Sequence, residues 1–406
     1  MIPIIIILAG LLATGSAMAS DGPALPWGQT PPASAAYARA TRIAELGRKL
    51  FFDPALSASG GLACASCHDP AHGFAAPNRL AVQLGGPDLR HPGTRAVPSL
   101  IYGAFAPAFS EHFFESEEDG DESVDQGPTG GRDWDGRVDR ARDQAALPLF
   151  DPNEMANTGQ DAVVATVARG GYANDLRRLY GRNVFTTPAK AFAAVTEALE
   201  FYQQTPAMFS PFSSKYDAFL RGSARLTKQE ARGLAVFNNP ERGNCMQCHK
   251  SAATADGRPP LFTDFGYVAL GVPRNREIPA NADPAYFDLG LCGPQRHDLT
   301  AAKYCGMFKA PTLRNVALKE SFYHNGIFHS LRDAVAFYAE RDVDPGKWYP
   351  IGRDGNVHKF NDLPAAYVAN VNQELPFGGR RVLSDADVDD LVAFLRTLTD
   401  GFRMQR

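Results

Sequence analysis

Cys64-Ala65-Ser66-Cys67-His68 follows the pattern Cys-x-x-Cys-His, and the same pattern returns at Cys245-Met246-Gln247-Cys248-His249. Each pentapeptide is typical of a covalent attachment site for c-type haem, because two thiols can form thioether bonds while the adjacent histidine reaches the iron. The weaker alternative is a pair of thiol, disulfide or zinc sites, each followed by a chance histidine. We expect two covalently bound haems c, with His68 and His249 as iron ligands.

Helical patterns precede both motifs, over residues 43–52 and 229–237, and they form a weak internal repeat. Two cytochrome-c-like domains in tandem explain this repeat. The boundary is expected within residues 205–225, where prolines and serines interrupt the helical pattern. We therefore predict an N-terminal domain over residues 20–215 and a C-terminal domain over residues 216–406.

A last helix is predicted from Ser384 to about Leu398, where apolar residues recur at helical spacing. It should lie beside the second haem. Strand-like alternation is scarce, and the 30 prolines and 37 glycines indicate many loops. The predicted fold class is mainly α, with long irregular connections between the helices.

The first residues of the chain resemble an export signal. Residues 2–13 form an apolar run too short to span a bilayer, and Ala17-Met18-Ala19 has the small-x-small pattern of a cleavage site. We predict a signal peptide over residues 1–19, a periplasmic location and no membrane span after cleavage; an uncleaved anchor is the alternative, because no Lys or Arg precedes the apolar run. In an exported protein Cys292 and Cys305 should form a disulfide, with two free buried thiols as the alternative.

The charge of the chain limits its partners. The net charge is −4 and the pI is near 6.2, with no dense Lys/Arg tract, so a nucleic-acid partner has no electrostatic basis. Acidic residues gather in the segment 111–125 around Gly120. A solvated loop is the favoured interpretation of this segment, and a calcium site is the other.

A second axial ligand decides whether a haem carries electrons or activates a bound molecule. We expect one open haem, whose iron has a free coordination position, and one closed haem, whose iron has a protein ligand on both faces. Tyr338 lies on a short amphipathic helix predicted over residues 330–340 and points inward, but from pattern alone a hydrogen-bonded core residue is favoured over a metal ligand. Other candidate donors after the second motif are Met307, Met404, His297, His324, His329 and His358.

Residues 134–155 contain a denser cluster of residues that could take part in chemistry: Trp134, Arg137, Gln144, Pro148 and Glu154. Structural roles suit each of them, with Arg137 binding carboxylates or haem propionates. A glutamate in a dry haem pocket could instead move a proton between the two oxygens of bound peroxide. The residue types alone leave both interpretations open.

Together these residues resemble the bacterial dihaem cytochrome c peroxidase family, and more closely its MauG-like branch. The resemblance covers nearly the whole chain after the signal. Besides the two haem motifs, it is carried by residues 134–155, by Ala310-Pro311-Thr312-Leu313-Arg314-Asn315-Val316 and by His324-Asn325-Gly326.

This resemblance implies a role for each site residue. The N-terminal haem would react with peroxide, with His68 as its proximal ligand and Gln144, Pro148 and Glu154 lining its distal pocket. Trp134 would lie between the haems and relay electrons, and His249 would be the proximal ligand of the C-terminal haem.

The distal ligand of the second haem separates the branches of the family. Ordinary members use methionine, whereas MauG-like enzymes use tyrosine, and the matching position here is Tyr338. The resemblance therefore favours Tyr338 as a ligand over a core role. A phenolic oxygen favours oxidised iron, whereas a thioether raises the potential.

The implied activity starts with peroxide at the open haem, where Glu154 and Gln144 promote cleavage of the O–O bond. Trp134 lets the second haem share the two oxidising equivalents, which then oxidise a side chain of a partner protein at long range. Residues 337–350, with Cys292 and Cys305, look most like the methanobactin-associated subgroup, whose enzymes modify a tryptophan in a copper-binding partner.

Two alternatives to this activity are kept open. One is a cytochrome c peroxidase that reduces hydrogen peroxide with electrons from a small donor cytochrome. The other is an electron carrier without catalysis, which needs a second ligand on both haems. His72, His91 or His112 would then have to serve in the N-terminal domain.

Some positions depart from the family pattern. An asparagine that commonly helps to bind calcium is replaced by Ala96, and another calcium-binding stretch reads Lys319-Glu320-Ser321. Calcium is therefore an uncertain cofactor. MauG passes charge to its substrate through a tryptophan two residues before the second motif, where this chain has Gly243, so methylamine dehydrogenase is not the expected partner.

Overall fold

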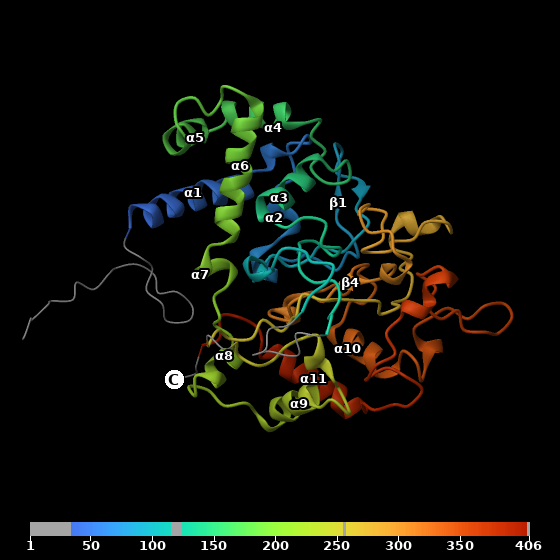
Figure 1. Cartoon of the computed structure of the whole chain (residues 1–406). Helices are drawn as coiled ribbons and strands as arrows, with labels where there is room; N and C mark the ends of the chain where they lie inside the picture. The colour runs from blue at the N-terminus through green and yellow to red at the C-terminus, as the bar shows by residue number, and fades with distance from the viewer. Residues whose placement is uncertain (1–33, 115–123, 255–256, 404–406) are drawn as a thin grey trace, which may run out of the picture.

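The computed structural model describes residues 34–114, 124–254 and 257–403, so the predicted signal peptide lies outside the described residues. Helices dominate, as predicted (Figure 1). The α-helices are α1 (Ala35–Phe51), α2 (Cys64–Cys67), α3 (Ala141–Phe150), α4 (Gln160–Arg169), α5 (Ala173–Tyr180), α6 (Pro188–Gln203), α7 (Pro206–Phe209), α8 (Lys215–Leu220), α9 (Lys228–Asn238), α10 (Leu331–Glu340) and α11 (Asp385–Arg396).

The remaining described elements are short. Two antiparallel pairs of two-residue strands are formed by β1 (Leu84–Gly85) with β2 (His91–Pro92), and by β3 (Tyr267–Val268) with β4 (Phe308–Lys309). Short 3₁₀ helices cover Pro54–Leu56, Pro70–His72, Gly103–Phe105, Cys245–Gln247, Pro279–Ala282, Ala302–Tyr304, Val316–Leu318, Pro345–Lys347 and Ala365–Asn370. Among the described residues, no helix is long and apolar enough to cross a membrane.

The N-terminal core forms where α1 crosses α6. Ile43 and Leu50 on α1 are fully buried, and Ser34 caps the helix by accepting a hydrogen bond from the Tyr37 N–H. The two backbones meet at Gly47, where a Cβ atom would lie 1.8 Å from the Ala198 carbonyl oxygen. Only a residue without a side chain permits this approach, which closes the core beside the first haem motif.

The C-terminal core repeats this arrangement with α9 and α11. Thr227 and Ser384 begin these helices with capping boxes, so α11 is the helix predicted from Ser384. At the crossing, a Cβ atom on Gly233 would lie 2.0 Å from the Asp390 carbonyl oxygen. The weak sequence repeat therefore corresponds to a repeated helix crossing in space.

Substituting Gly233 by alanine should destabilise the protein, because the new methyl group would overlap the backbone of α11. Overpacking of this kind costs roughly 1–3 kcal/mol of the free energy of unfolding. Gly379→Ala is the matched control, since nothing lies within 4 Å of the position of its Cβ. Urea unfolding followed by circular dichroism measures both, and equal midpoints for the two variants would contradict the assigned crossing.

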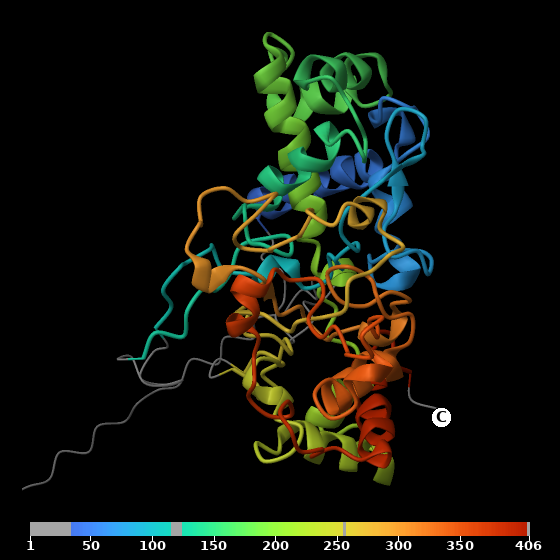
Figure 2. The ribbon, with the colours of Figure 1, turned by 90° about the vertical axis from the view of Figure 1, so that its right-hand side faces the viewer.

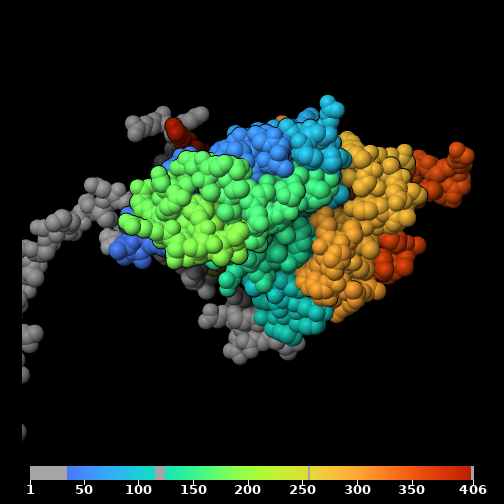
Figure 3. Space-filling view, turned by 90° about the horizontal axis from the view of Figure 1, so that it is seen from above, coloured from blue at the N-terminus to red at the C-terminus, as the bar shows by residue number. Residues whose placement is uncertain are grey.

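Buried apolar side chains form two large clusters, one from residues up to Phe209 and the other from Tyr216 onwards. These two parts of the chain are called the first half and the second half. Loops from the second half nevertheless reach the first half, as the orange segments show (Figures 2 and 3). The Tyr267 hydroxyl donates a hydrogen bond of 2.6 Å to the Gly130 carbonyl oxygen, and Arg95 forms an ion pair of 2.6 Å with Asp288. These contacts hold the two halves together around the candidate site.

Candidate haem sites and the residue between them

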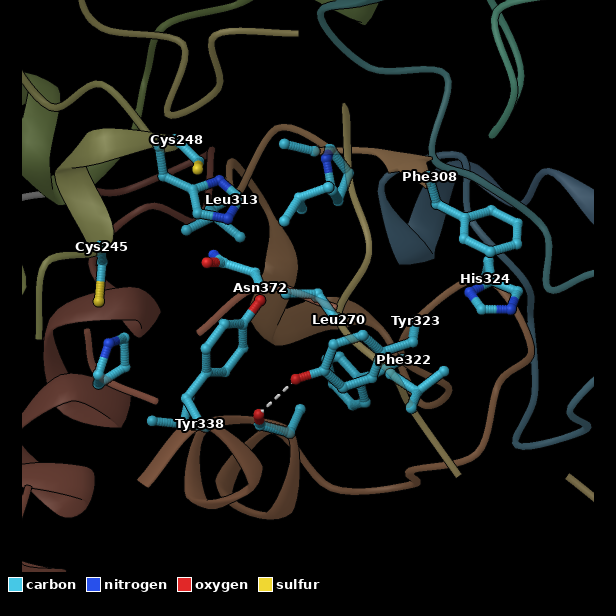
Figure 4. A pocket seen from close by; sticks show the side chains of 18 of the residues that line it. Cys245, Cys248, Leu270, Phe308, Leu313, Phe322, Tyr323, His324, Tyr338 and Asn372 are labelled. Atoms are coloured by element: carbon cyan, nitrogen blue, oxygen red, sulfur yellow. Dashed lines mark hydrogen bonds between the residues drawn. The ribbon is translucent and has the colours of Figure 1, made fainter. Parts of the chain in front are cut away.

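Each haem-attachment motif lines its own cavity. Cys64, Cys67 and His68 line a cavity of about 1290 Å³ in the first half, and the second motif lines one of about 1700 Å³ in the second half; both values include the open mouth. The two cavities are large enough for a prosthetic group rather than a single ion. The second cavity is surrounded mainly by apolar side chains (Figure 4).

The four motif cysteines are free thiols, which argues against the disulfide alternative. Burial is the first cause that raises the pKa of Cys64, Cys67, Cys245 and Cys248 to about 12, so these groups are protonated thiols at neutral pH. Among the described residues, no group of three His, Cys, Asp or Glu side chains is arranged to hold a metal ion. The donor sets fit a covalently bound haem.

Both motif histidines are oriented in the same way by the main chain. His68 Nδ1 lies 3.0 Å from the Phe74 carbonyl oxygen, and His249 Nδ1 lies 2.9 Å from that of Phe262. If Nδ1 carries the proton in this hydrogen bond, Nε2 remains free as a ligand. Burial lowers the pKa of His68 to about 4 and lowers that of His249, so both rings are neutral, which suits an iron ligand.

Glu154 brings a carboxyl group to the first cavity. It follows α3, and its carbonyl oxygen accepts a hydrogen bond of 2.7 Å from the Gly86 N–H. The side chain is open to the cavity but lies deep in the protein, and desolvation is the first cause that raises its pKa to about 7; Asp151 and Asp133 add to the shift. A carboxyl that titrates near neutral pH can both accept and donate a proton.

Gln144 and Pro148, both on α3, line the same cavity. Pro148 has no N–H and stands four residues after Gln144, so the Gln144 carbonyl lacks its usual helical donor. Gln144 Nε2 donates a hydrogen bond of 3.3 Å to Asp133 Oδ1. Burial raises the pKa of Asp133, and Arg137, whose Nη2 lies 3.2 Å from Asp133 Oδ2, opposes this shift.

The histidines that an electron carrier would need lie elsewhere. None of them lines the first cavity as described, and each faces a carboxylate instead: His72 with Asp69 (2.6 Å), His91 with Asp88 (3.5 Å) and His112 with Asp125 (2.6 Å). This arrangement disfavours a second histidine ligand at the first haem.

Tyr338 on α10 lines the second cavity together with the second motif. Figure 4 shows its hydroxyl pointing into the cavity, and its ring stacks on Phe377 with a centroid distance of 5.2 Å. Burial is the first cause that raises the pKa of Tyr338, followed by the two motif thiols. The phenol therefore keeps its proton unless a cation such as iron displaces it.

Of the other described candidate donors, His324 lines this cavity, whereas Met307, His297, His329 and His358 do not. His324 stacks on Phe308 at 3.4 Å, and burial lowers its pKa to about 3. Met404 lies outside the described residues.

Trp134 belongs to the walls of both cavities. Its side chain is 6% exposed, and its Nε1–H donates a hydrogen bond of 2.8 Å to the Ala96 carbonyl oxygen. The neighbouring Asp135 is fully buried and binds Arg95 (2.7 Å) and Arg137 (3.0 Å). One aromatic ring is therefore fixed between the two candidate haem sites.

Three further residues with polar side chains line the second cavity. Tyr323 donates a hydrogen bond of 2.8 Å to the Ala334 carbonyl oxygen and is a hydrogen-bonding neighbour of Tyr338. No sequence pattern pointed to Tyr323. Lys309 and Lys319 also line this cavity.

The structure joins Cys292 to Cys305 by a disulfide.

Comparisons with known proteins agree with this geometry. The family model of di-haem cytochrome c peroxidase matches residues 41–225. Methylamine utilization protein MauG from Paracoccus denitrificans is 36% identical over 373 residues, which are 88% of this chain and 88% of that protein.

Two solved structures are also similar. The diheme peroxidase BthA from Burkholderia thailandensis is 43% identical, with a TM-score of 0.78 over 93% of this chain and 89% of that one. A MauG-like protein associated with microbial copper homeostasis is 24% identical, with a TM-score of 0.63 over 96% of each chain, and shows the fold alone. The chain therefore belongs to the MauG-type dihaem cytochrome c peroxidase family and is a peroxidase-type oxidoreductase.

Proposed function

We propose that this protein reacts with hydrogen peroxide, stores two oxidising equivalents over two covalently bound haems c, and oxidises a side chain of a secreted partner protein. The observation that carries the proposal is the position of Trp134 on both cavities, with Glu154 in the first and Tyr338 in the second. Tryptophan is the side chain we expect to be oxidised, and a copper-binding protein is one candidate partner.

The haems would be held by the four motif cysteines, with His68, His249 and Tyr338 as iron ligands, and they would supply the iron that takes up oxidising equivalents. Glu154 accepts a proton from peroxide on its carboxylate and returns it to the departing oxygen. Over the whole reaction one peroxide, two protons and two electrons from the partner side chain give two waters. Gln144 orients the peroxide through its amide.

Tyr338 supplies a hard oxygen ligand, which favours the oxidised state of the second site. Trp134 connects the sites by passing one electron at a time, losing and regaining that electron with no net change. The partner therefore does not need to enter either cavity. A periplasmic location suits the disulfide and the thioether-linked haems.

Treating the fully loaded ferric enzyme with one equivalent of peroxide tests the proposal. We expect a two-electron-oxidised form that persists for minutes and is quenched by a tryptophan-containing partner peptide. Electron paramagnetic resonance of the resting enzyme should show one high-spin and one low-spin haem. Rapid steady-state turnover with reduced cytochrome c, without a stored state, would instead identify a cytochrome c peroxidase.

Trp134→Phe should slow the sharing of oxidising equivalents between the sites by roughly tenfold or more, while the phenyl ring keeps most of the cavity wall intact. Phenylalanine is much harder to oxidise than tryptophan, so the variant should lose the electron relay and keep the fold. Freeze-quench paramagnetic resonance after peroxide addition measures the effect. If oxidising equivalents are shared at an unchanged rate in a variant with both haems attached, Trp134 is not part of the proposed electron relay.

A further inference from the structure

Lys319 places a positive charge beside the ring of Trp134. Its Nζ lies 5.8 Å from the centroid of the indole, and the residue lines the second cavity. Burial lowers the pKa of Lys319 to about 8, which still lies above neutral pH. The side chain is therefore mainly an ammonium ion at pH 7.

The other lysine that lines this cavity, Lys309, has a different environment. Lys309 Nζ donates a hydrogen bond of 2.6 Å to the Gly131 carbonyl oxygen, and Asp133 and Asp135 raise its pKa against the effect of burial. Burial is the cause that lowers the pKa of Lys319, and within the described ranges Lys319 forms no ion pair with an acidic side chain. Its charge is thus not balanced by a nearby carboxylate of the described chain.

The acidic groups nearest to Trp134 in sequence are already bound by cations. Asp135 is held by Arg95 at 2.7 Å and Arg137 at 3.0 Å, and Asp133 lies 3.2 Å from Arg137. These pairs reduce the negative potential that would otherwise favour removal of an electron from the indole. The ammonium of Lys319 adds to this effect.

Oxidised Trp134 would have to remain a cation. Its Nε1–H donates to the Ala96 carbonyl oxygen at 2.8 Å, and an amide carbonyl is far too weak a base to take the proton. A cation beside the neutral ring is attractive, whereas a cation beside the oxidised ring is repulsive. Both effects make the loss of an electron less favourable.

We infer that Lys319 raises the potential needed to oxidise Trp134, so that oxidising equivalents pass through the indole without accumulating there. Each passage removes one electron from Trp134 towards the first site and returns one from the second site. Lys319 is a positioning residue that acts through Trp134, and the inference rests on the proposed relay function of that tryptophan.

Lys319→Met tests the inference, because the methionine side chain has nearly the same length and no charge. The tryptophan cation radical trapped after peroxide addition should increase about tenfold relative to wild type, as expected from the loss of a desolvated cation–π contact. This factor corresponds to about 59 mV for one electron. Lys319→Arg keeps the charge and should stay close to wild type.

The radical is measured by freeze-quench paramagnetic resonance, and both haem midpoint potentials are measured by spectroelectrochemistry in proteins with complete haem loading. Adding Trp134→Phe to Lys319→Met should abolish the new signal. An unchanged radical yield in Lys319→Met with both haems attached overturns the inference. A change confined to the midpoint potential of the C-terminal haem also overturns it, because Lys319 would then act on that haem and not on Trp134. If Trp134→Phe alone leaves the sharing of oxidising equivalents between the two sites unchanged, the proposed relay role of Trp134 is wrong instead.

Discussion

Glu154→Gln is expected to slow the reaction with hydrogen peroxide by roughly 10²- to 10⁴-fold, which is the usual contribution of a general acid–base group. The amide keeps the size of the carboxyl but cannot accept the peroxide proton. Stopped-flow mixing of loaded ferric enzyme with peroxide gives the second-order rate constant. Asp143→Asn is the matched control, since Asp143 is an exposed acid on α3, which also carries Gln144.

The pH dependence gives a second check on Glu154. Its pKa is raised from 4.5 to about 7, so the carboxyl is mainly protonated below pH 7 and mainly ionised above it. Since the base must be ionised to take the proton, the wild-type rate constant should rise about tenfold per pH unit below pH 7 and then level off. A variant that keeps this profile would show that another group accepts the proton.

Tyr338→Met should raise the midpoint potential of the C-terminal haem by a few hundred millivolts, within the range of about 0.8 V that axial ligands cover. The thioether stabilises reduced iron, so the stored two-electron-oxidised form should be lost while both haems remain attached. Spectroelectrochemistry measures the potential, and intact mass measures the haem content.

Tyr323→Phe serves as the comparison for Tyr338→Met. Tyr323 lines the same cavity and also lies among aromatic side chains, but its hydroxyl donates to the Ala334 carbonyl oxygen. We expect a much smaller shift in potential for this variant. Equal potentials in wild type and Tyr338→Met, or a stored state that survives the exchange, would disprove the ligand assignment.

Much of the fold follows from local sequence signals. The helical patterns before the two motifs lie in α1 and α9, and α11 begins after Ser384, where apolar spacing predicted the last helix. The two Cys-x-x-Cys-His motifs locate the cavities because the covalent chemistry requires thiols and imidazole at fixed spacing. These signals need no knowledge of contacts between distant segments.

The site is only partly predictable. The apolar spacing of the helix over residues 330–340 favoured a core role for Tyr338. Only the family resemblance favoured a role as an iron ligand. The position of Lys319 beside Trp134 depends on how a loop of the second half folds against the first. The Arg95–Asp288 pair joins residues 193 positions apart for the same reason. No local pattern specifies such contacts.

The hydrogen bonds that orient His68 and His249 end on peptide oxygens rather than on side chains. Phe74 and Phe262 present these oxygens from left-handed backbone conformations, with φ values of 54° and 55°. Replacing either phenylalanine side chain leaves the acceptor atom in place. The surroundings of both porphyrins can therefore diverge during evolution, and redox properties can be retuned, while the alignment of the imidazoles is inherited unchanged.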